Sequence, residues 1–217
     1  MNRYLLAPAV FAMSAVPAFA HHPLAGAPME TLTDGILSGI GHPVLGFDHL
    51  FFVIAVGIAA LYTGRTKLAT AAYIGAMMFG CLLMSFGISL PVKEFVIGIS
   101  LFVVGGLLLS GRATGLAPTV GLFAVFGLFH GSAFGDTIAA QEAGAGVTVL
   151  AGYLVGLGLL QYGLALLAGF VVHTLLKATE AQHIHVRLAG AVVAGVGTFL
   201  TLENIEGLVF NILGLAA

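Results

Sequence analysis

The chain has 217 residues, of which 59% are hydrophobic and only 7% are charged, whereas soluble domains carry roughly 25% charged residues. This composition excludes an ordinary soluble protein and predicts an integral membrane protein. The formal net charge of −2 leaves no basic surface that could displace counterions from a nucleic acid, so nucleic-acid binding is set aside. Cys81 is the only cysteine in the sequence, and it is interpreted as a small packing residue.

Residues 1–20 have the pattern of a cleavable secretory signal peptide. Arg3 precedes an apolar stretch over residues 4–16, and the small residues Ala18 and Ala20 complete a cleavage motif. The apolar stretch is shorter than the ~20 residues that a membrane span needs. We therefore expect residues 1–20 to be removed rather than retained as a first span.

Cleavage would leave His21 and His22 at the new N-terminus, beyond the membrane. A free amine beside two imidazoles can ligate a metal ion, although exposed terminal histidines are also commonly solvated. Residues 23–41 then carry apolar side chains near helical spacing, which predicts an amphipathic helix that leads into the first span.

Six apolar segments follow, and they predict an all-α fold: a polytopic bundle of six transmembrane helices in one domain over residues 21–217. Short connectors between the segments carry most of the charged residues. The lipid bilayer is therefore the expected surrounding of most of the surface. The expected spans are residues 44–62, 68–90, 94–110, 116–140, 146–176 and 186–207.

Basic residues near the span ends predict the orientation, because Lys and Arg stay on the cytoplasmic side. If the mature N-terminus is outside, only Lys93 falls outside, and the other basic residues of the mature chain fall inside. This distribution favours both ends on the periplasmic side of a bacterial inner membrane. The residues expected inside are Arg65, Lys67, Arg112, Lys177 and Arg187.

Ionisable residues cluster at the start of the first span. His42 and His49 lie seven positions apart, about two turns of a continuous helix, so we expect them to share one face, with Asp48 beside His49. An ionisable side chain in the hydrocarbon costs ~2.5 to 3.5 kcal/mol and normally turns toward a partner or a wet cavity. These three residues therefore predict a functional site in the outer part of the membrane.

The fourth span carries a second cluster, His130 and Asp136. That span is expected to run outward, which brings both side chains to the depth of the first cluster. Imidazole nitrogens and carboxylate oxygens suit divalent ions such as nickel, cobalt or zinc. The predicted metal ligands are His42, Asp48, His49, His130 and Asp136.

The two motifs resemble those of the HupE/UreJ family of bacterial membrane proteins. They read His-Pro-x-x-Gly-Phe-Asp-His-Leu at residues 42–50 and Phe-His-Gly-x-Ala-x-Gly-Asp at residues 129–136. The resemblance covers the signal peptide, the six spans and both motifs in order. It implies an association with hydrogenase and urease maturation and with the uptake of nickel or cobalt.

Residue by residue, the resemblance implies site roles for four positions, and the chain departs from the family pattern at two others. Phe134 stands where many members have a second histidine. Asp136 directly follows Gly135, whereas other members place a carboxylate one residue later. These departures leave the choice between nickel and cobalt open. The four matching positions are His42, Asp48, His49 and His130.

Other polar residues could add to this site. Gln161 falls about where several family members have histidine, so it is either an oxygen donor or a hydrogen-bonding partner across helices. Glu203 and Glu206 lie toward the outer end of the last span, near the expected depth of the site. The remaining histidines of the last two spans are expected in loops at the cytoplasmic end: His173, His183 and His185.

These observations predict a secondary permease, not an enzyme, that passes a nickel or cobalt ion from the periplasm through a His/Asp site between the first and fourth spans. No Walker-type phosphate loop occurs in the sequence, so this chain does not itself use ATP. The ion is cargo, and no cofactor is expected to stay bound. A homo-oligomer and metalloenzyme maturation proteins are the macromolecular partners considered.

Two alternatives stay open. The protein could sequester metal for hydrogenase, urease or cobalamin metal supply without transporting it. Less in keeping with the motifs, His49 and His130 could be the axial haem ligands of a membrane cytochrome.

Overall fold

A computed structural model describes residues 28–140 and 146–214. The predicted signal peptide and the histidines His21 and His22 lie outside these residues. Within the described part the chain is helical and has no strand, which confirms the expected all-α fold. The helices are α2 (Leu32–Leu45), α3 (Phe47–Leu61), α4 (Thr66–Ser85), α5 (Lys93–Ser110), α6 (Leu116–Ala139), α7 (Val147–Phe170), the π-helix η2 (Val171–Leu175) that continues it, and α8 (Ile184–Ile212).

Five helical segments are long and apolar enough to cross a membrane, namely α4, α5, α6, α7 with η2, and α8. They match the last five predicted spans to within a few residues. The pair of α2 and α3 passes the same test only when the two helices are taken together. The described residues therefore contain five spans, or six if this pair is one span.

The expectation that His42 and His49 share one face of a continuous helix is wrong, because the chain bends by 84° between α2 and α3. Gly46 joins the two helices in an extended conformation, with φ −87° and ψ 100°. Pro43, in the last turn of α2, has no backbone N–H, so the helical hydrogen bond back to the carbonyl four residues earlier is missing there. His42 thus ends one helix and His49 begins the next, so they do not share a face of one helix.

Glycines of α6 allow close contact between α4 and α6. Gly127, Gly131 and Gly135 of α6 lie against the backbone and side chains of α4. A Cβ atom on Gly131 would overlap the carbonyl oxygen of Met77. Since both helices run in the same direction, this glycine ridge fixes the depth of α6 residues relative to α4.

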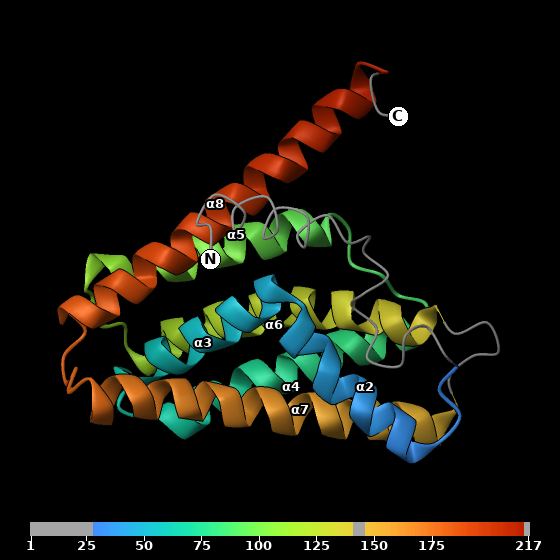
Figure 1. Cartoon of the computed structure of the whole chain (residues 1–217), viewed down its shortest axis with the longest axis horizontal. Coiled ribbons are helices and arrows are strands. Elements are labelled where there is room, and N and C mark those ends of the chain that lie inside the picture. Colours follow the sequence, from blue (N-terminus) through green and yellow to red (C-terminus); the bar gives the residue numbers. More distant parts are fainter. Residues whose placement is uncertain (1–27, 141–145, 215–217) are drawn as a thin grey trace, which may run out of the picture.

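The bent pair of helices follows α7 along its length (Figure 1). Gly152 and Gly156 of α7 lie against the backbone of α2, and further along the chain Gly57 of α3 lies against Ala165 of α7. Residues of α2 and then of α3 therefore meet α7 in the same order along the chain. Gly152 and Gly156 serve this close packing.

The last helix packs on α5 only over its first part. Gly98 of α5 lies against Thr201 of α8, close to where α5 begins. Beyond this contact α8 leaves the bundle (Figure 1), and its large apolar side chains there are exposed. These side chains are Leu202, Ile205, Leu208, Val209, Phe210, Ile212 and Leu213.

We predict that Gly131→Ala lowers the free energy of unfolding in detergent by about 1 to 3 kcal/mol, because the added methyl group meets backbone atoms that cannot move aside. Gly121→Ala is the matched control on the same helix, since a Cβ atom there would contact nothing within 4 Å. Denaturant unfolding of both variants measures the difference. Equal stabilities would contradict the close α4–α6 contact.

Candidate metal site

Polar side chains gather at one end of the bundle, where α3, α5 and α7 begin and α4 and α6 end. We call this the site end. Two hydrogen bonds connect these helix ends: the backbone N–H of Leu90 donates to Ser132 Oγ at 3.1 Å, and Tyr153 donates to the Phe134 carbonyl at 3.0 Å. The two clusters of ionisable residues, on the first and fourth predicted spans, therefore lie at the same level of the bundle, as expected.

A buried contact between two imidazoles lies at the centre of the site. Nδ1 of His49, in the first turn of α3, lies 2.9 Å from Nδ1 of His130 on α6. His130 is fully buried and His49 is 6% exposed. The ring of Phe52 stacks on His130, with the ring centres 4.1 Å apart, which closes the inner side of the pair.

The surrounding hydrogen bonds decide which nitrogens carry protons. The Ser100 hydroxyl donates to the Ile97 carbonyl at 2.7 Å and lies 2.9 Å from Nε2 of His130. A hydroxyl has one proton, so when Ser100 donates to Ile97, Nε2 of His130 is the donor to Ser100. In this tautomer Nδ1 of His130 accepts from Nδ1 of His49, and Nε2 of His49 keeps an unprotonated lone pair.

That lone pair lies beside a carboxylate. Nε2 of His49 is 3.8 Å from Oδ2 of Asp48, too far for a hydrogen bond. A lone pair and a carboxylate oxygen repel each other unless a proton or a metal cation lies between them. A transition-metal ion bonds to such atoms at ~2.0 to 2.2 Å, so both atoms can ligate one ion with little movement.

His42 reaches the same region from the end of α2. Its Nδ1 lies 2.7 Å from Thr137 Oγ1 and 3.2 Å from the Tyr153 hydroxyl. The rings of His42 and His49 are 6.0 Å apart. The bend at Gly46 therefore brings together two histidines that lie on different helices.

Phe134 fills the space between these two histidines. Its buried ring lies 4.2 Å from the ring of His49 and 5.1 Å from that of His42. The residue at which the chain departs from the family motif is therefore in direct contact with two of the predicted ligands.

Asp136 also lies at the site end, but it pairs with a cation of the protein. Its Oδ1 is 2.5 Å from Nζ of Lys93, at the start of α5. Glu94, the next residue, is a further acidic residue at the start of α5. The site end is acidic overall, and Lys93 engages the carboxylate of Asp136.

In the part of the chain that the structure describes, no three His, Cys, Asp or Glu side chains form a ready-made metal site. His42, Asp48, His49 and His130 converge, while Asp136 is engaged by Lys93. Their role as metal ligands remains a prediction. The geometry supplies one two-ligand position, between His49 and Asp48, with His42 nearby.

The other candidates lie elsewhere. Gln161 accepts a hydrogen bond from Tyr73 at 2.7 Å, so it does bond across helices. Glu203 and Glu206 are exposed on the outer part of α8. At the opposite end of the bundle, His183 caps α8 and accepts from the backbone N–H of His185 at 3.3 Å, while His173 is exposed on η2.

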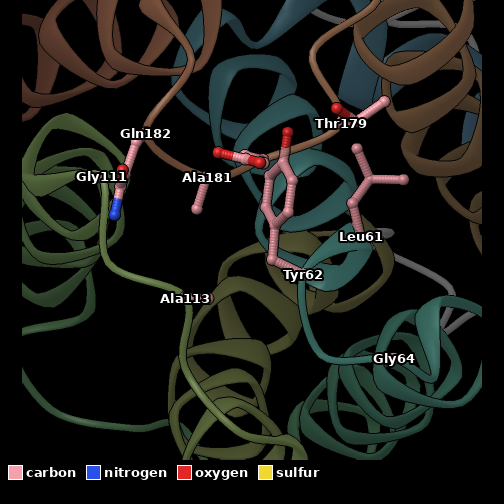
Figure 2. Close-up of a pocket in the computed structure, with 9 residues that line it drawn as sticks. Leu61, Tyr62, Gly64, Gly111, Ala113, Thr179, Ala181 and Gln182 are labelled. Carbon is pink, nitrogen blue, oxygen red and sulfur yellow. The ribbon is translucent and has the colours of Figure 1, made fainter.

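A surface hollow of about 460 Å³ lies at the end of the bundle opposite the His pair. Figure 2 shows the ring of Tyr62 rising from the end of α3 toward the segment with Thr179 and Ala181. Glu180 is the one charged residue in its lining, and no histidine lines it. The hollow thus lacks the nitrogen ligands that a nickel or cobalt site would use.

Sequence reasoning missed several residues that shape the site. Ser100 and Thr137 are single hydroxyls within apolar helices, and membrane helices use such hydroxyls commonly enough that they gave no specific signal. From the sequence alone, Tyr153 and Phe52 look like ordinary aromatic residues of the core. In the sequence, Lys93 serves only to predict the orientation in the membrane. The positive charge of Lys93 and the predicted carboxylate ligand Asp136 are nevertheless complementary, which is the signal for an ion pair.

Comparisons with known proteins agree with the two motifs. The family described as HupE / UreJ protein matches residues 9–200. Protein HupE of Rhizobium leguminosarum bv. viciae is 29% identical over 192 residues, which cover 86% of this chain and 92% of that protein. No solved structure matches significantly. Together with the apolar helices, these matches indicate a multi-pass membrane protein.

We predict that neutral His130 carries its proton on Nε2 and neutral His49 on Nδ1. Long-range ¹⁵N–¹H correlation spectra of imidazole-labelled protein measure this directly. Ser100→Ala removes the acceptor for His130 and should change the tautomer populations of both rings, while His185, exposed on α8, stays as it is. A proton on Nε2 of neutral His49 would contradict the assignment.

Proposed function

The chain belongs to the HupE/UreJ family, and we propose that it is a secondary permease that carries nickel or cobalt ions across the bacterial inner membrane from the periplasm. The observation that supports this most is the 3.8 Å distance between Nε2 of His49 and the Asp48 carboxylate, two atoms that can ligate one ion. A position that attracts a cation, with two mixed ligands, suits binding that can be reversed.

The acidic site end provides the first step of the proposed mechanism. Asp48 is 25% exposed at its side chain, so a hydrated ion can reach it from outside. The ion exchanges part of its water shell for Asp48 Oδ2 and His49 Nε2. His42, whose ring lies 6.0 Å from that of His49, can add a third ligand by a side-chain movement.

The position of the bent helices supports six spans rather than five. α2 and α3 contact α7 in order along its length and in the same direction, which is expected of one broken span and not of a loop that turns back. Broken helices in secondary transporters commonly line the substrate site. Six spans after a cleaved signal peptide would place both ends of the mature chain in the periplasm.

The alternatives predict different behaviour. A metal-sequestering accessory would bind the ion without moving it, so uptake by reconstituted vesicles separates it from a permease. A haem between His49 and His130 would have to break the 2.9 Å contact between their Nδ1 atoms, which disfavours a cytochrome. A Soret band in the purified protein would support the cytochrome alternative.

We predict that His49→Ala and Asp48→Ala each reduce nickel or cobalt uptake by cells at least about tenfold at limiting metal, because each removes one of the two proposed ligands. His185→Ala is the control, since His185 is exposed on α8. Uptake of radioactive metal at matched expression measures the effect. Normal uptake in both site variants would refute the proposed site.

Equilibrium titration of the purified protein with nickel, cobalt and zinc should identify the preferred ion. We expect binding to weaken at least about tenfold in His49→Ala. The Phe134→His variant, which restores the second histidine of many family members, should bind more tightly because it adds an imidazole beside His49 and His42. Identical titrations of all three proteins would contradict the assignment.

A further inference from the structure

Three polar side chains are completely buried between α4 and α7. The hydroxyl of Tyr73 donates to Oε1 of Gln161 at 2.7 Å, but Nε2 of Gln161 has no hydrogen-bond partner among the described residues. The hydroxyl of Thr70 also lacks a partner there. All three side chains are 0% exposed, so water at the protein surface cannot satisfy them.

Contacts on either side place these side chains at one depth. Tyr162 of α7 donates to the Lys67 carbonyl of α4 at 3.5 Å, while Gly158, one turn earlier on α7, lies beside Ile74 of α4. Thr70 and Tyr73 fall between the α4 positions, and Gln161 falls between the α7 positions. The unpartnered atoms of Thr70 and Gln161 therefore belong to the same layer.

This layer is the next polar level inward from the histidine pair. Gly131, beside His130 in sequence, packs against Met77 of α4, and Thr70 lies seven residues further inward on that helix, roughly 10 Å away. Aromatic rings separate the two levels. Phe52 stacks on His130 at 4.1 Å and lies 5.5 Å from Tyr73.

The unpartnered atoms have complementary chemistry. The amide nitrogen of Gln161 can only donate, whereas the Thr70 hydroxyl can donate and accept. Leaving such groups unsatisfied costs ~1 to 3 kcal/mol each, and a water molecule with two or more polar partners removes that cost. A water within reach of both groups that accepted from Gln161 and donated to Thr70 would keep one lone pair for a cation.

We propose that Thr70, Tyr73 and Gln161 form a second station for the transported ion, at which held water and side-chain oxygens replace the ligands that the ion leaves at His49 and Asp48. This inference rests on the proposed permease function. The phenol of Tyr73 connects the two levels, because its ring lies 6.4 Å from His130 while its hydroxyl binds Gln161. The oxygens of Thr70 and Gln161 make this station weaker for nickel or cobalt than the imidazole level, which favours onward release.

The test uses purified full-length protein in vesicles and nickel chloride as the probe. Thr70→Val keeps the shape of the side chain and removes the hydroxyl, and Thr70→Ser restores it. A Tyr73→Phe/Gln161→Leu double variant removes the amide without leaving the phenol unpaired. Thr198→Val on α8 is the control, since Thr198 bonds only within its own helix, to the Ala194 carbonyl at 2.8 Å.

We expect nickel uptake to fall about tenfold in Thr70→Val and in the double variant, and to recover in Thr70→Ser, while equilibrium nickel binding to the detergent-purified proteins stays within about twofold of the starting protein. Wild-type uptake in both variants would overturn the second station, and so would a parallel loss of binding. Absence of uptake by the unmodified protein would instead refute the permease function, and the station with it. If Thr70→Val does not fold, Thr70→Ala and the double variant decide the question.

Discussion

The site depends on one buried contact, the hydrogen bond between Nδ1 of His49 and Nδ1 of His130 at 2.9 Å. In hydrocarbon, polar groups must find partners inside the protein, and this contact gives each imidazole one. The Ser100 hydroxyl lies within hydrogen-bond distance of both the Ile97 carbonyl and His130, so its orientation sets the proton order along the three residues. When it donates to the carbonyl, His49 presents an unprotonated nitrogen to the Asp48 carboxylate, as a bound cation would require.

This contact forms because two packing arrangements meet. The glycine ridge of α6 brings that helix close to α4 and sets the depth of His130. The bend at Gly46 lets α3 start next to α6 while α2 remains on α7. A straight helix would carry His42 and His49 on one face of one rod, whereas the break presents them from two directions, with Phe134 between them.

The interior then alternates between polar and aromatic levels. The imidazole and carboxylate level lies at the site end, the rings of Phe52 and Tyr73 follow, and the hydroxyl of Thr70 with the amide of Gln161 comes next. Such an alternation of levels suits the proposed transport, in which an ion binds, is released and binds again, because no single level is a closed cage. The outer part of α8 takes no part in these contacts, and its apolar side chains suit a lipid surrounding.

The sequence by itself determined the class of the protein and the residues of interest. Apolar length and composition act locally, so five helices and the all-α membrane fold followed from the chain. The ionisable residues were conspicuous because charge is rare in such segments. Only the tertiary structure decided how they pair: His49 meets His130 across 81 residues, His42 meets Tyr153 across 111, and Asp136 meets Lys93 rather than a histidine. Periodicity carries no information on partners so distant in the chain. It also predicted that one helix continues through Gly46, whereas Pro43 and the packing against α7 end the helix there.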